Sequence, residues 1–459
     1  MFMKIETLKG QKVTIMGLGL HGGGIASARF FAKAGAEVTV TDLGAPEILQ
    51  SSVDKLSDLN IRFVLGEHRE IDFSSADMVI KNPAVPAGSP FLKLARRIET
   101  DISIFLQLSE NRIIAVTGSK GKSTTVSAVY HVMKKIYPGT KLGGNITVSP
   151  LTFLHSLEKN DPVILELSSW QLADLGERDL LKPQIAVITN IMHDHQNRYD
   201  RFEDYVYDKK LIYRNQDHSD ISIFADDSFG REFQKESKGQ IYTFHSSEPH
   251  RDNCIKRGWI KDKKGYFSED GIKIEELISD NLSVPGEHFR INMLIAAMIL
   301  KKFGIETGQI RKGLSSFSGV NHRMERFTEK NGVTFYNDSA ATIPEATAAA
   351  IRSFITPVIL ITGGTDKELQ FQCLKEPLTM AKSIILLEGS GTDKILLILQ
   401  ESCIPWKGPY STLSEALEES VQSAERGDSI IFSPGCTSFG MFLNEFDRGD
   451  RFKELVFRL

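Results

Sequence analysis

The sequence contains few cysteines, and they follow no recognisable pattern. Four occur among 459 residues, widely separated and without CxxC or Cys/His spacing: Cys254, Cys373, Cys403 and Cys436. This usage argues against a disulfide framework and against a structural zinc site. Because free cysteines are typical of a reducing compartment, we expect a cytoplasmic protein.

Long apolar runs and an excess of one charge are also missing. No run approaches the ~18 apolar residues of a membrane span, and the N-terminus lacks the apolar stretch and cleavage site of a signal peptide. Lys and Arg number 55 against 59 Asp and Glu, for a formal net charge of −4. Such a balance provides no long-range attraction for nucleic acid or an acidic membrane. We therefore expect no nucleic-acid or membrane partner. Independently of this balance, we expect a monomer that acts on small-molecule substrates.

The chain has no internal repeat, low-complexity tract or heptad run, which excludes solenoids and coiled coils. At ~150 residues per domain, its length predicts about three domains. Segments typical of strands and helices alternate, so we expect an α/β fold. The expected domains are a Rossmann-like domain over 1–108, a central mononucleotide-binding domain over 109–319 and a C-terminal Rossmann-like domain over 320–459.

The first domain opens as a strand at 12–17, a glycine turn, a helix and a strand at 37–42, with a further strand expected at 76–83. The turn Gly17–Gly22 satisfies GxGxxG, and Asp42 follows roughly 20 residues later, as in a dinucleotide fingerprint. The same turn can hold the diphosphate of NAD or of a UDP-linked substrate, or can serve only to pack a tight βα turn. All three interpretations stay open at this point.

The central domain contains TGSKGKST between an apolar strand and a helix. Backbone N–H groups of such a loop point at phosphate oxygens, Lys122 can pair with the β- and γ-phosphates, and Ser123 can ligate Mg²⁺. The standard GxxxxGK[ST] motif would require glycine where Val116 stands, and the usable glycines are Gly118 and Gly121. We expect a shortened phosphate loop.

Charged and imidazole side chains follow later in this domain. Glu166 ends a predicted strand and His195 lies in TNIMHDH, and loops at the carboxyl ends of parallel strands build ligand sites. A carboxylate can bind Mg²⁺ and an imidazole can reach a second ion, with Asp194 as a ligand or as the group that orients His195. Lys209 and Lys210 lie on a polar helix, and physical reasoning alone predicts surface charge for both.

The pattern weakens between 222 and 282 into short alternating pieces such as QIYTFH, which predict a small antiparallel appendage. A helix is expected over 289–304. A third α/β run follows, with strands expected at TFYNDS, PVILITGGTD, SIILLEGSG and DSIIFSPG. Each of these strands ends in a polar, glycine-rich loop.

Taken together, the motifs resemble those of the Mur ligase family, the ATP-dependent amino-acid-adding enzymes of peptidoglycan synthesis. The resemblance covers nearly the whole chain. Its motifs are GLG near the start, TGSKGKST, GGNI, LELSSWQL, TNIMHDHQNRY, HR at 322–323, NDS at 337–339, GGTDK, and SPGCTSFGMF with RG at 448–449. ELSSWQL behind an N-terminal domain of this size is most similar to the branch that joins glutamate to UDP-N-acetylmuramoyl-L-alanine.

The resemblance implies a reaction. ATP would phosphorylate the L-alanine carboxylate to an acyl phosphate, which the glutamate amine would attack to give an amide, ADP and phosphate in cytoplasmic peptidoglycan precursor synthesis. It implies ATP and two Mg²⁺ ions as cofactors. D-Glutamate is the first choice of acceptor, and L-glutamate is the alternative.

The resemblance also implies site residues. ATP would be bound by Gly118, Ser119, Lys120, Gly121, Lys122, Ser123, Thr124, Asn292, Arg323 and Asp338. The UDP-linked substrate would be bound by Gly17, Leu18, Gly19, Asp42, Asn82, Asn145, Ser168 and His195. Metal ions would be held by Ser123, Glu166, His195 and a carbamylated Lys209, and the acceptor by His322, Lys367 and Ser438. The catalytic set would be Lys122, Asn145, Glu166, His195 and Lys209.

Three positions depart from the family pattern. Ala340 stands where a lysine is usual near the phosphates. Phe289 stands where an asparagine of the adenine site is usual, so Asn292 is the asparagine that remains in this predicted helix. Glu445 stands where a phenylalanine is usual. A switch of acceptor to L-glutamate would require changes around the acceptor loop.

Three other hypotheses compete with this one. A folylpolyglutamate-synthase-like ligase shares the phosphate loop but lacks a UDP-binding domain ahead of it. An NAD-dependent oxidoreductase depends on the glycine turn and Asp42 alone, and leaves the phosphate loop unexplained. A non-enzymatic, nucleotide-gated binding protein would fit if Ala340 marked lost catalysis.

Overall fold

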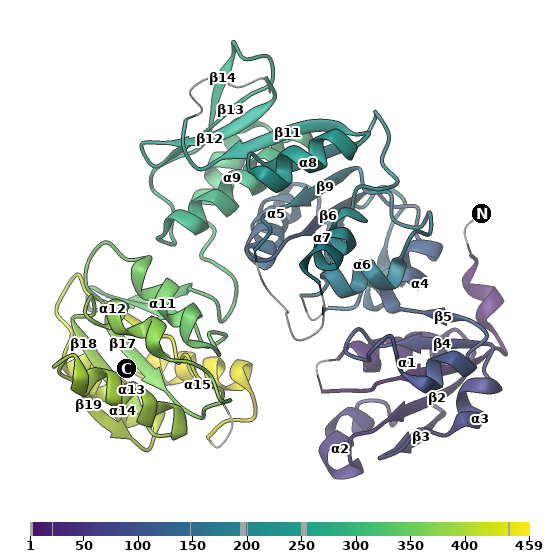
Figure 1. Ribbon diagram of the computed structural model, residues 1–459, viewed down its shortest axis with the longest axis horizontal. Coiled ribbons are helices and arrows are strands. Elements are labelled where there is room, and N and C mark those ends of the chain that lie inside the picture. The colour runs from purple at the N-terminus through teal and green to yellow at the C-terminus, as the bar shows by residue number, and fades with distance from the viewer. Residues whose placement is uncertain are drawn as a thin grey trace. The chain divides into compact units, whose positions relative to one another are not determined.

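The chain folds into two compact units in a computed structural model (Figure 1). One unit comprises Met1–Ile278 with Asn292–Ile310, and the other comprises Ser279–Ile291 with Arg311–Leu459. The structure describes residues 3–20, 22–146, 148–192, 199, 201–248, 255–438 and 441–459. None of the helices within these ranges is long and apolar enough to cross a membrane.

The N-terminal sheet has five strands in the order β3-β2-β1-β4-β5, all parallel. The strands are β1 (Lys12–Met16), β2 (Glu37–Asp42), β3 (Ile61–Leu65), β4 (Met78–Lys81) and β5 (Ile98–Glu99). The accompanying helices are η1 (Ile5–Leu8), α1 (Gly23–Lys33), α2 (Pro46–Asp54), α3 (Glu70–Ser74), η2 (Pro90–Leu94) and α4 (Asp101–Leu108). The βαβ opening and the strand expected at 76–83 are confirmed.

The central sheet has nine strands in the order β14-β13-β12-β11-β10-β9-β6-β8-β7. They are β6 (Ile113–Thr117), β7 (Lys141–Gly144), β8 (Val163–Glu166), β9 (Ile185–Ile188), β10 (Ile221–Ala225), β11 (Gln240–His245), β12 (Arg257–Lys261), β13 (Lys264–Ser268) and β14 (Ile274–Ile278). The helices are α5 (Lys122–Ile136), η3 (Pro150–Thr152), η4 (Leu154–Ser156), α6 (Ser169–Leu175), α7 (Phe202–Lys210), α8 (Ser228–Glu236) and α9 (Glu287–Lys302). Strands β6, β8 and β9 are buried throughout, as expected for parallel strands covered on both faces.

The antiparallel appendage is smaller than the sequence pattern predicts. QIYTFH forms β11, which pairs parallel with β10, so assigning it to an antiparallel segment was wrong. Helix α8 connects β10 to β11, and such a crossover is what allows consecutive strands to run parallel. Among the described strands of this sheet, only β12–β13 and β13–β14 pair antiparallel, at the end of the sheet that Figure 1 shows farthest from α6.

The second unit contains a six-stranded sheet in the order β15-β16-β20-β17-β18-β19, parallel except for β15. The strands are β15 (Glu325–Lys330), β16 (Val333–Asn337), β17 (Ile359–Gly363), β18 (Ser383–Leu387), β19 (Lys407–Tyr410) and β20 (Ser429–Phe432). The helices are α10 (Thr307–Ser315), which begins in the first unit, α11 (Pro344–Arg352), η5 (Gln372–Leu374), α12 (Lys375–Leu378), α13 (Ser390–Glu401), α14 (Leu413–Gln422) and α15 (Glu445–Arg458).

Apolar residues of this sheet alternate between two cores. Leu360 and Ile384 pack with residues of α11 and α13, whereas Ile359 and Ile385 pack with residues of α14 and α15. Because side chains of a strand point alternately to opposite faces, both faces must be covered by helices. The Rossmann-like architecture expected for this region is therefore confirmed.

Candidate active site

The phosphate loop lies at the centre of the central sheet. Strand β6 lies between β8 and β9 and runs parallel to both, so the carboxyl ends of all three strands meet at one edge. The loop leaves β6 after Thr117, and α5 begins at Lys122. Backbone groups of Ser119 and Lys120 are held by Asn190, at 2.9 Å in each case. The loop therefore has a fixed shape at the N-terminus of a helix, where a phosphate is bound favourably.

Two glycines allow this close packing. A Cβ atom on Gly118 would lie 1.9 Å from Oγ1 of Thr189, and one on Gly121 would lie 2.3 Å from Oδ1 of Asn292. Both glycines also have positive φ, 141° and 84°. The predicted loop is thus formed with Asn292, a predicted ATP residue, directly against it.

Gly121→Ala is expected to weaken the affinity for a non-hydrolysable ATP analogue by at least ~10-fold, because a methyl group would displace Asn292 and strain the loop by about 1–3 kcal/mol. Titration calorimetry measures the change. Gly304→Ala is the control, since Gly304 has φ +96° but no atom within 4 Å of its added Cβ. Equal affinities in the two variants would contradict the assignment of this loop.

Glu166 and Asn145 meet beside the loop. Glu166 pairs in register with Val116 of β6 and is 1% exposed. Its Oε1 accepts a hydrogen bond from Nδ2 of Asn145 at 2.9 Å, whereas its buried Oε2 has no hydrogen-bond partner among the described residues. A buried carboxylate oxygen with no partner is costly unless something binds it. This oxygen and its position fit a Mg²⁺ ligand.

The described residues contain no cluster of three or more His, Cys, Asp or Glu side chains that could hold a metal. Mg²⁺ commonly uses one or two carboxylates together with water and substrate phosphates. A single buried carboxylate such as Glu166 is therefore compatible with one Mg²⁺ ion. His195 and Asp194, predicted at the second ion, lie outside the described residues.

Lys209 is buried, so the prediction of surface charge for it was wrong. It is 2% exposed, its Nζ donates to the carbonyl oxygen of Gly118 at 3.0 Å, and it lies 4.5 Å from the ring centroid of Tyr205. The next residue, Lys210, instead forms ion pairs with Glu232 and Glu236 outside the site. Adjacent residues of α7 thus place one lysine at the phosphate loop and the next lysine in ion pairs with glutamates of α8.

Two residues that shape the loop, Thr189 and Tyr205, were not singled out from the sequence. Oγ1 of Thr189 donates to the carbonyl oxygen of Lys120 at 2.6 Å, and the hydroxyl groups of Ser119 and Tyr205 lie 2.8 Å apart.

Two predicted residues make local contacts. Ser168 caps α6 through Gln171. The Lys122 ammonium donates to the carbonyl oxygens of Gly118 and Ser119, at 2.9 and 3.0 Å.

A cavity with a volume of about 540 Å³ lies at the carboxyl edge of the N-terminal sheet. Its lining includes the five predicted residues of this domain, Gly17, Leu18, Gly19, Asp42 and Asn82. Oδ2 of Asp42 accepts from the amides of Leu18 and Gly19 at 2.7 and 3.0 Å. In a dinucleotide fingerprint the acidic residue binds the ribose. Here its carboxylate holds the turn itself, which differs from the ribose contact of an NAD site.

In the second unit, Asp338 is buried and accepts from the hydroxyl of Ser433 at 2.7 Å and the amide of Met324 at 2.9 Å. Burial raises its pKa to about 7, although both hydrogen bonds oppose the change. Burial also lowers the pKa of His322, whose Nδ1 lies 3.1 Å from Nδ2 of Asn337. Asp338 directly follows β16, and His322 contacts the last residue of that strand; the neighbouring Arg323 is exposed.

The raised pKa of Asp338 predicts a loss of stability as pH rises from about 4 to about 7. In that range the folded protein keeps a proton that the unfolded chain releases, so the free energy of unfolding falls, by at most ~4 kcal/mol for this group. Asp338→Asn should remove this slope, because the amide does not titrate. Urea unfolding of both proteins at pH 5 and pH 7.5 measures it, and parallel pH dependences would contradict the prediction.

Ser438 lines a cavity of about 260 Å³ at the carboxyl ends of β17, β18 and β20, together with the buried Arg448. Lys367 is exposed and, like His322, is not part of this lining. The structure therefore does not bring the three predicted acceptor residues into one described cavity.

The three departures have local structural settings. The amide of Ala340 donates to the carbonyl oxygen of His322 at 2.8 Å. Phe289 stacks on Phe317 at 6.1 Å between centroids. Glu445 begins α15, and its carbonyl oxygen accepts from the Ser339 hydroxyl at 2.7 Å. Nothing in these contacts supplies the charge of the missing lysine.

Comparison with known families and proteins gives consistent results. The chain matches the Mur ligase MurD-like N-terminal domain over 11–104, the Mur ligase middle domain over 116–300 and the Mur ligase glutamate ligase domain over 322–436. UDP-N-acetylmuramoylalanine--D-glutamate ligases of Borreliella afzelii (strain PKo) and Treponema pallidum (strain Nichols) are 42% and 39% identical to it. The alignments cover 99% of both chains in the first case and 98% in the second.

Solved structures share the fold. UDP-N-acetylmuramate-alanine ligase MurC from Thermotoga maritima superimposes with a TM-score of 0.62 at 20% identity, over 98% of this chain and 99% of that one. UDP-N-acetylmuramoylalanyl-D-glutamyl-2,6-diaminopimelate--D-alanyl-D-alanyl ligase from Acinetobacter baumannii gives 0.58 at 18%, over 92% and 90%. With its three domain matches and full-length relatives, the chain belongs to the Mur ligase family of ATP-dependent amino-acid ligases.

Proposed function

We propose that this protein joins D-glutamate to the L-alanine carboxylate of UDP-N-acetylmuramoyl-L-alanine at the expense of ATP. One observation carries the proposal: the phosphate loop, the partly unpartnered carboxylate of Glu166 and the buried Lys209 meet at one edge of the central sheet. Full-length relatives with the name of this activity support the choice of substrates. L-Glutamate is the second candidate, because Ala340 and Glu445 depart from the usual pattern.

ATP would bind at the loop of residues 118–124, with Asn292 beside Gly121. The backbone amides and the Lys122 ammonium would orient the γ-phosphoryl group. Mg²⁺, held by Ser123 and Glu166, would neutralise charge on the phosphates. We infer a second ion near His195 and a carbamylated Lys209, since a carbamate would convert this buried ammonium into an oxygen ligand.

The substrate carboxylate would attack the γ-phosphorus of ATP to give an acyl phosphate and ADP. The amine of glutamate would then attack the acyl carbon and release phosphate. Asn145 and Ser168 are proposed to line the path of the reacting carboxylate. Most of the rate would come from positioning and charge neutralisation, because such transfer asks little covalent chemistry of the protein.

The UDP portion would occupy the 540 Å³ cavity of the N-terminal sheet. Arg323 and Asp338 are proposed to contact the nucleotide, and His322, Lys367 and Ser438 the acceptor. These residues lie in the C-terminal domain proposed for 320–459. The domain proposed for 1–108 would bind the UDP-linked substrate, and the domain proposed for 109–319 would bind ATP. We infer that the enzyme acts as a cytoplasmic monomer.

Isotope transfer tests the proposed chemistry. UDP-N-acetylmuramoyl-L-alanine with ¹⁸O in its carboxylate should give inorganic phosphate with one ¹⁸O atom per turnover, because the carboxylate oxygen bridges carbon and phosphorus in the acyl phosphate. Mass spectrometry of the phosphate detects it. Turnover that gives inorganic phosphate without ¹⁸O, with the departing carboxylate oxygen found in AMP or in water instead, would exclude the acyl phosphate route.

A further inference from the structure

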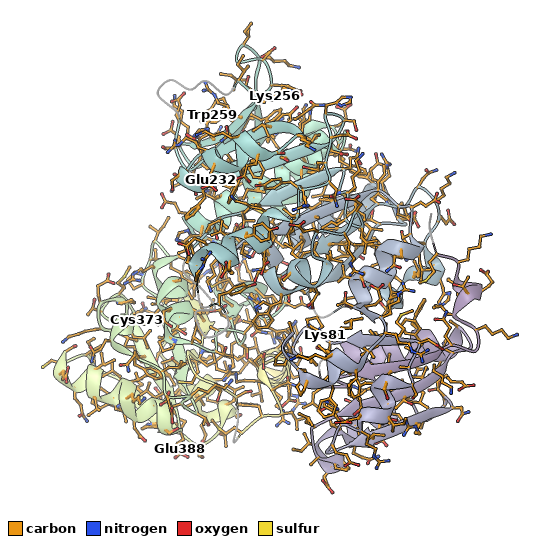
Figure 2. The ribbon with its side chains drawn as sticks, turned by 45° about the vertical axis from the view of Figure 1, so that its right-hand side comes forward. Lys81, Glu232, Lys256, Trp259, Cys373 and Glu388 are labelled. Atoms are coloured by element: carbon orange, nitrogen blue, oxygen red, sulfur yellow. The ribbon has the colours of Figure 1, made fainter. Side chains whose placement is uncertain are left out.

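Lys81 is a buried cation that the proposed reaction does not use. It ends β4, is 3% exposed, and is labelled in Figure 2. Its Nζ lies 2.7 Å from Oδ2 of Asp174, whose side chain is 13% exposed. Removing a charge from water is costly, so a pair this deeply buried is retained only where its geometry is good.

The ion pair connects the two halves of the first unit, which are the N-terminal sheet with its helices and the central sheet with its helices. Lys81 is followed directly by Asn82, which lines the 540 Å³ cavity, and the Lys81 ammonium lies 3.5 Å from the Asn82 carbonyl oxygen. Asp174 lies on the seven-residue helix α6, which Ser168 caps two positions after Glu166. One ion pair and one short helix therefore separate the substrate cavity from the carboxylate at the phosphate loop.

The surroundings of Lys81 favour a single, directional pair. A small space of about 20 Å³, large enough for one water molecule, has Lys81, Asn82 and Asp101 among its lining residues. Burial raises the pKa of Asp101, which favours its neutral form. Among the described residues, the carboxylate closest to the Lys81 ammonium is that of Asp174, at 2.7 Å.

A second ion pair joins the same two halves but differs in burial. Arg178, which follows α6, lies 2.9 Å from Oε2 of Glu99 on β5, and the arginine side chain is 40% exposed. Glu99 also accepts hydrogen bonds from Ser103 and Arg97. Loss of Arg178 therefore leaves the buried Glu99 with two other partners, and a pair whose arginine is 40% exposed contributes less than one buried on both sides.

We propose that Lys81 is a positioning residue: its ion pair with Asp174 holds the UDP-substrate cavity in register with Glu166 and the phosphate loop. This inference rests on the proposed function. A hydrogen-bonded ion pair fixes distance and direction, which an apolar contact does not. Displacement of reacting groups by about 1 Å can cost a factor of ~100 in rate.

The test replaces both partners, as Lys81→Met with Asp174→Leu, because apolar pairs of similar size often preserve stability where a single replacement would not. We expect kcat for phosphate release to fall ~30- to 100-fold. The Kd values of the UDP-substrate and of an ATP analogue, measured separately, should change less than ~3-fold. Lys81→Arg should recover most of kcat, and Arg178→Met, the matched control, should retain it.

Wild-type kcat in the double variant would overturn the inference, and so would a loss that Arg178→Met reproduces. If urea unfolding shows that the double variant does not fold, Asp174→Asn replaces it, with the same expected split between kcat and Kd. The wild-type protein separates the two claims. No turnover in the wild type defeats the proposed function, whereas turnover that is equal in wild type and variant defeats only the role of Lys81.

Discussion

Lys122→Ala is expected to lower ATP-dependent amide formation by at least ~10³-fold, because the variant loses a positive charge aimed at the transferring phosphoryl group. In the structure the Lys122 ammonium donates to carbonyl oxygens of the loop itself. The UDP-substrate should bind with unchanged Kd, since the cavity proposed for it is lined by residues of the N-terminal domain. Phosphate release and calorimetry of the UDP-substrate measure the two quantities.

Lys135→Ala is the matched control, because Lys135 is an exposed lysine in the last turn of the same helix, α5. Its activity should equal that of the wild type. Retained turnover in Lys122→Ala would contradict the assignment of the phosphate loop, and weaker binding of the UDP-substrate would contradict the separation of the two sites.

Lys209→Ala should lower kcat by ~10²-fold or more, and short carboxylates such as acetate or formate should restore part of it. The reason is chemical: if Lys209 acts as a carbamate, the variant lacks an oxygen ligand in a buried space that a small carboxylate can enter. Its position supports this, since Lys209 is 2% exposed and its Nζ lies 3.0 Å from the Gly118 carbonyl oxygen. Activity against carboxylate concentration measures the rescue.

Lys210→Ala provides the control one residue away. The Lys210 ammonium pairs with Glu232 and Glu236, so the variant should keep its activity and show no response to carboxylates. Thermal unfolding checks that both variants are folded. A Lys209→Ala protein that is folded and inactive, and that no carboxylate rescues, would contradict the carbamate role of Lys209.

The phosphate loop could be predicted because its signals are local. An apolar strand, two glycines, Lys122 and a helix follow one another within residues 113–136. Glu166 could be predicted for a related reason, since parallel strands bring their carboxyl ends to one edge wherever they lie in sequence. Its partly unpartnered state could not be predicted, because that depends on which neighbours reach Oε2.

Contacts between distant segments explain what sequence reasoning missed. Lys209 lies on a helix of mostly polar residues, and it is buried only because it meets Gly118, 91 positions away. Lys81 and Asp174 are 93 positions apart, and neither belongs to a motif. The parallel pairing of β11 depended on recognising α8 as a crossover helix. Periodicity indicates which face of an element is apolar, but not which distant residue meets a polar one.

The central claim is the identity of the ligation reaction, and the acceptor comparison tests it most directly. Phosphate release is measured with ATP, Mg²⁺ and UDP-N-acetylmuramoyl-L-alanine, with D-glutamate, L-glutamate or no acceptor, and the product is identified by mass. We predict release and an amide product with D-glutamate only. Release with L-glutamate only would contradict the proposed acceptor, and we would then attribute the change of acceptor to Ala340 and Glu445. No release with either amino acid would contradict the proposed function.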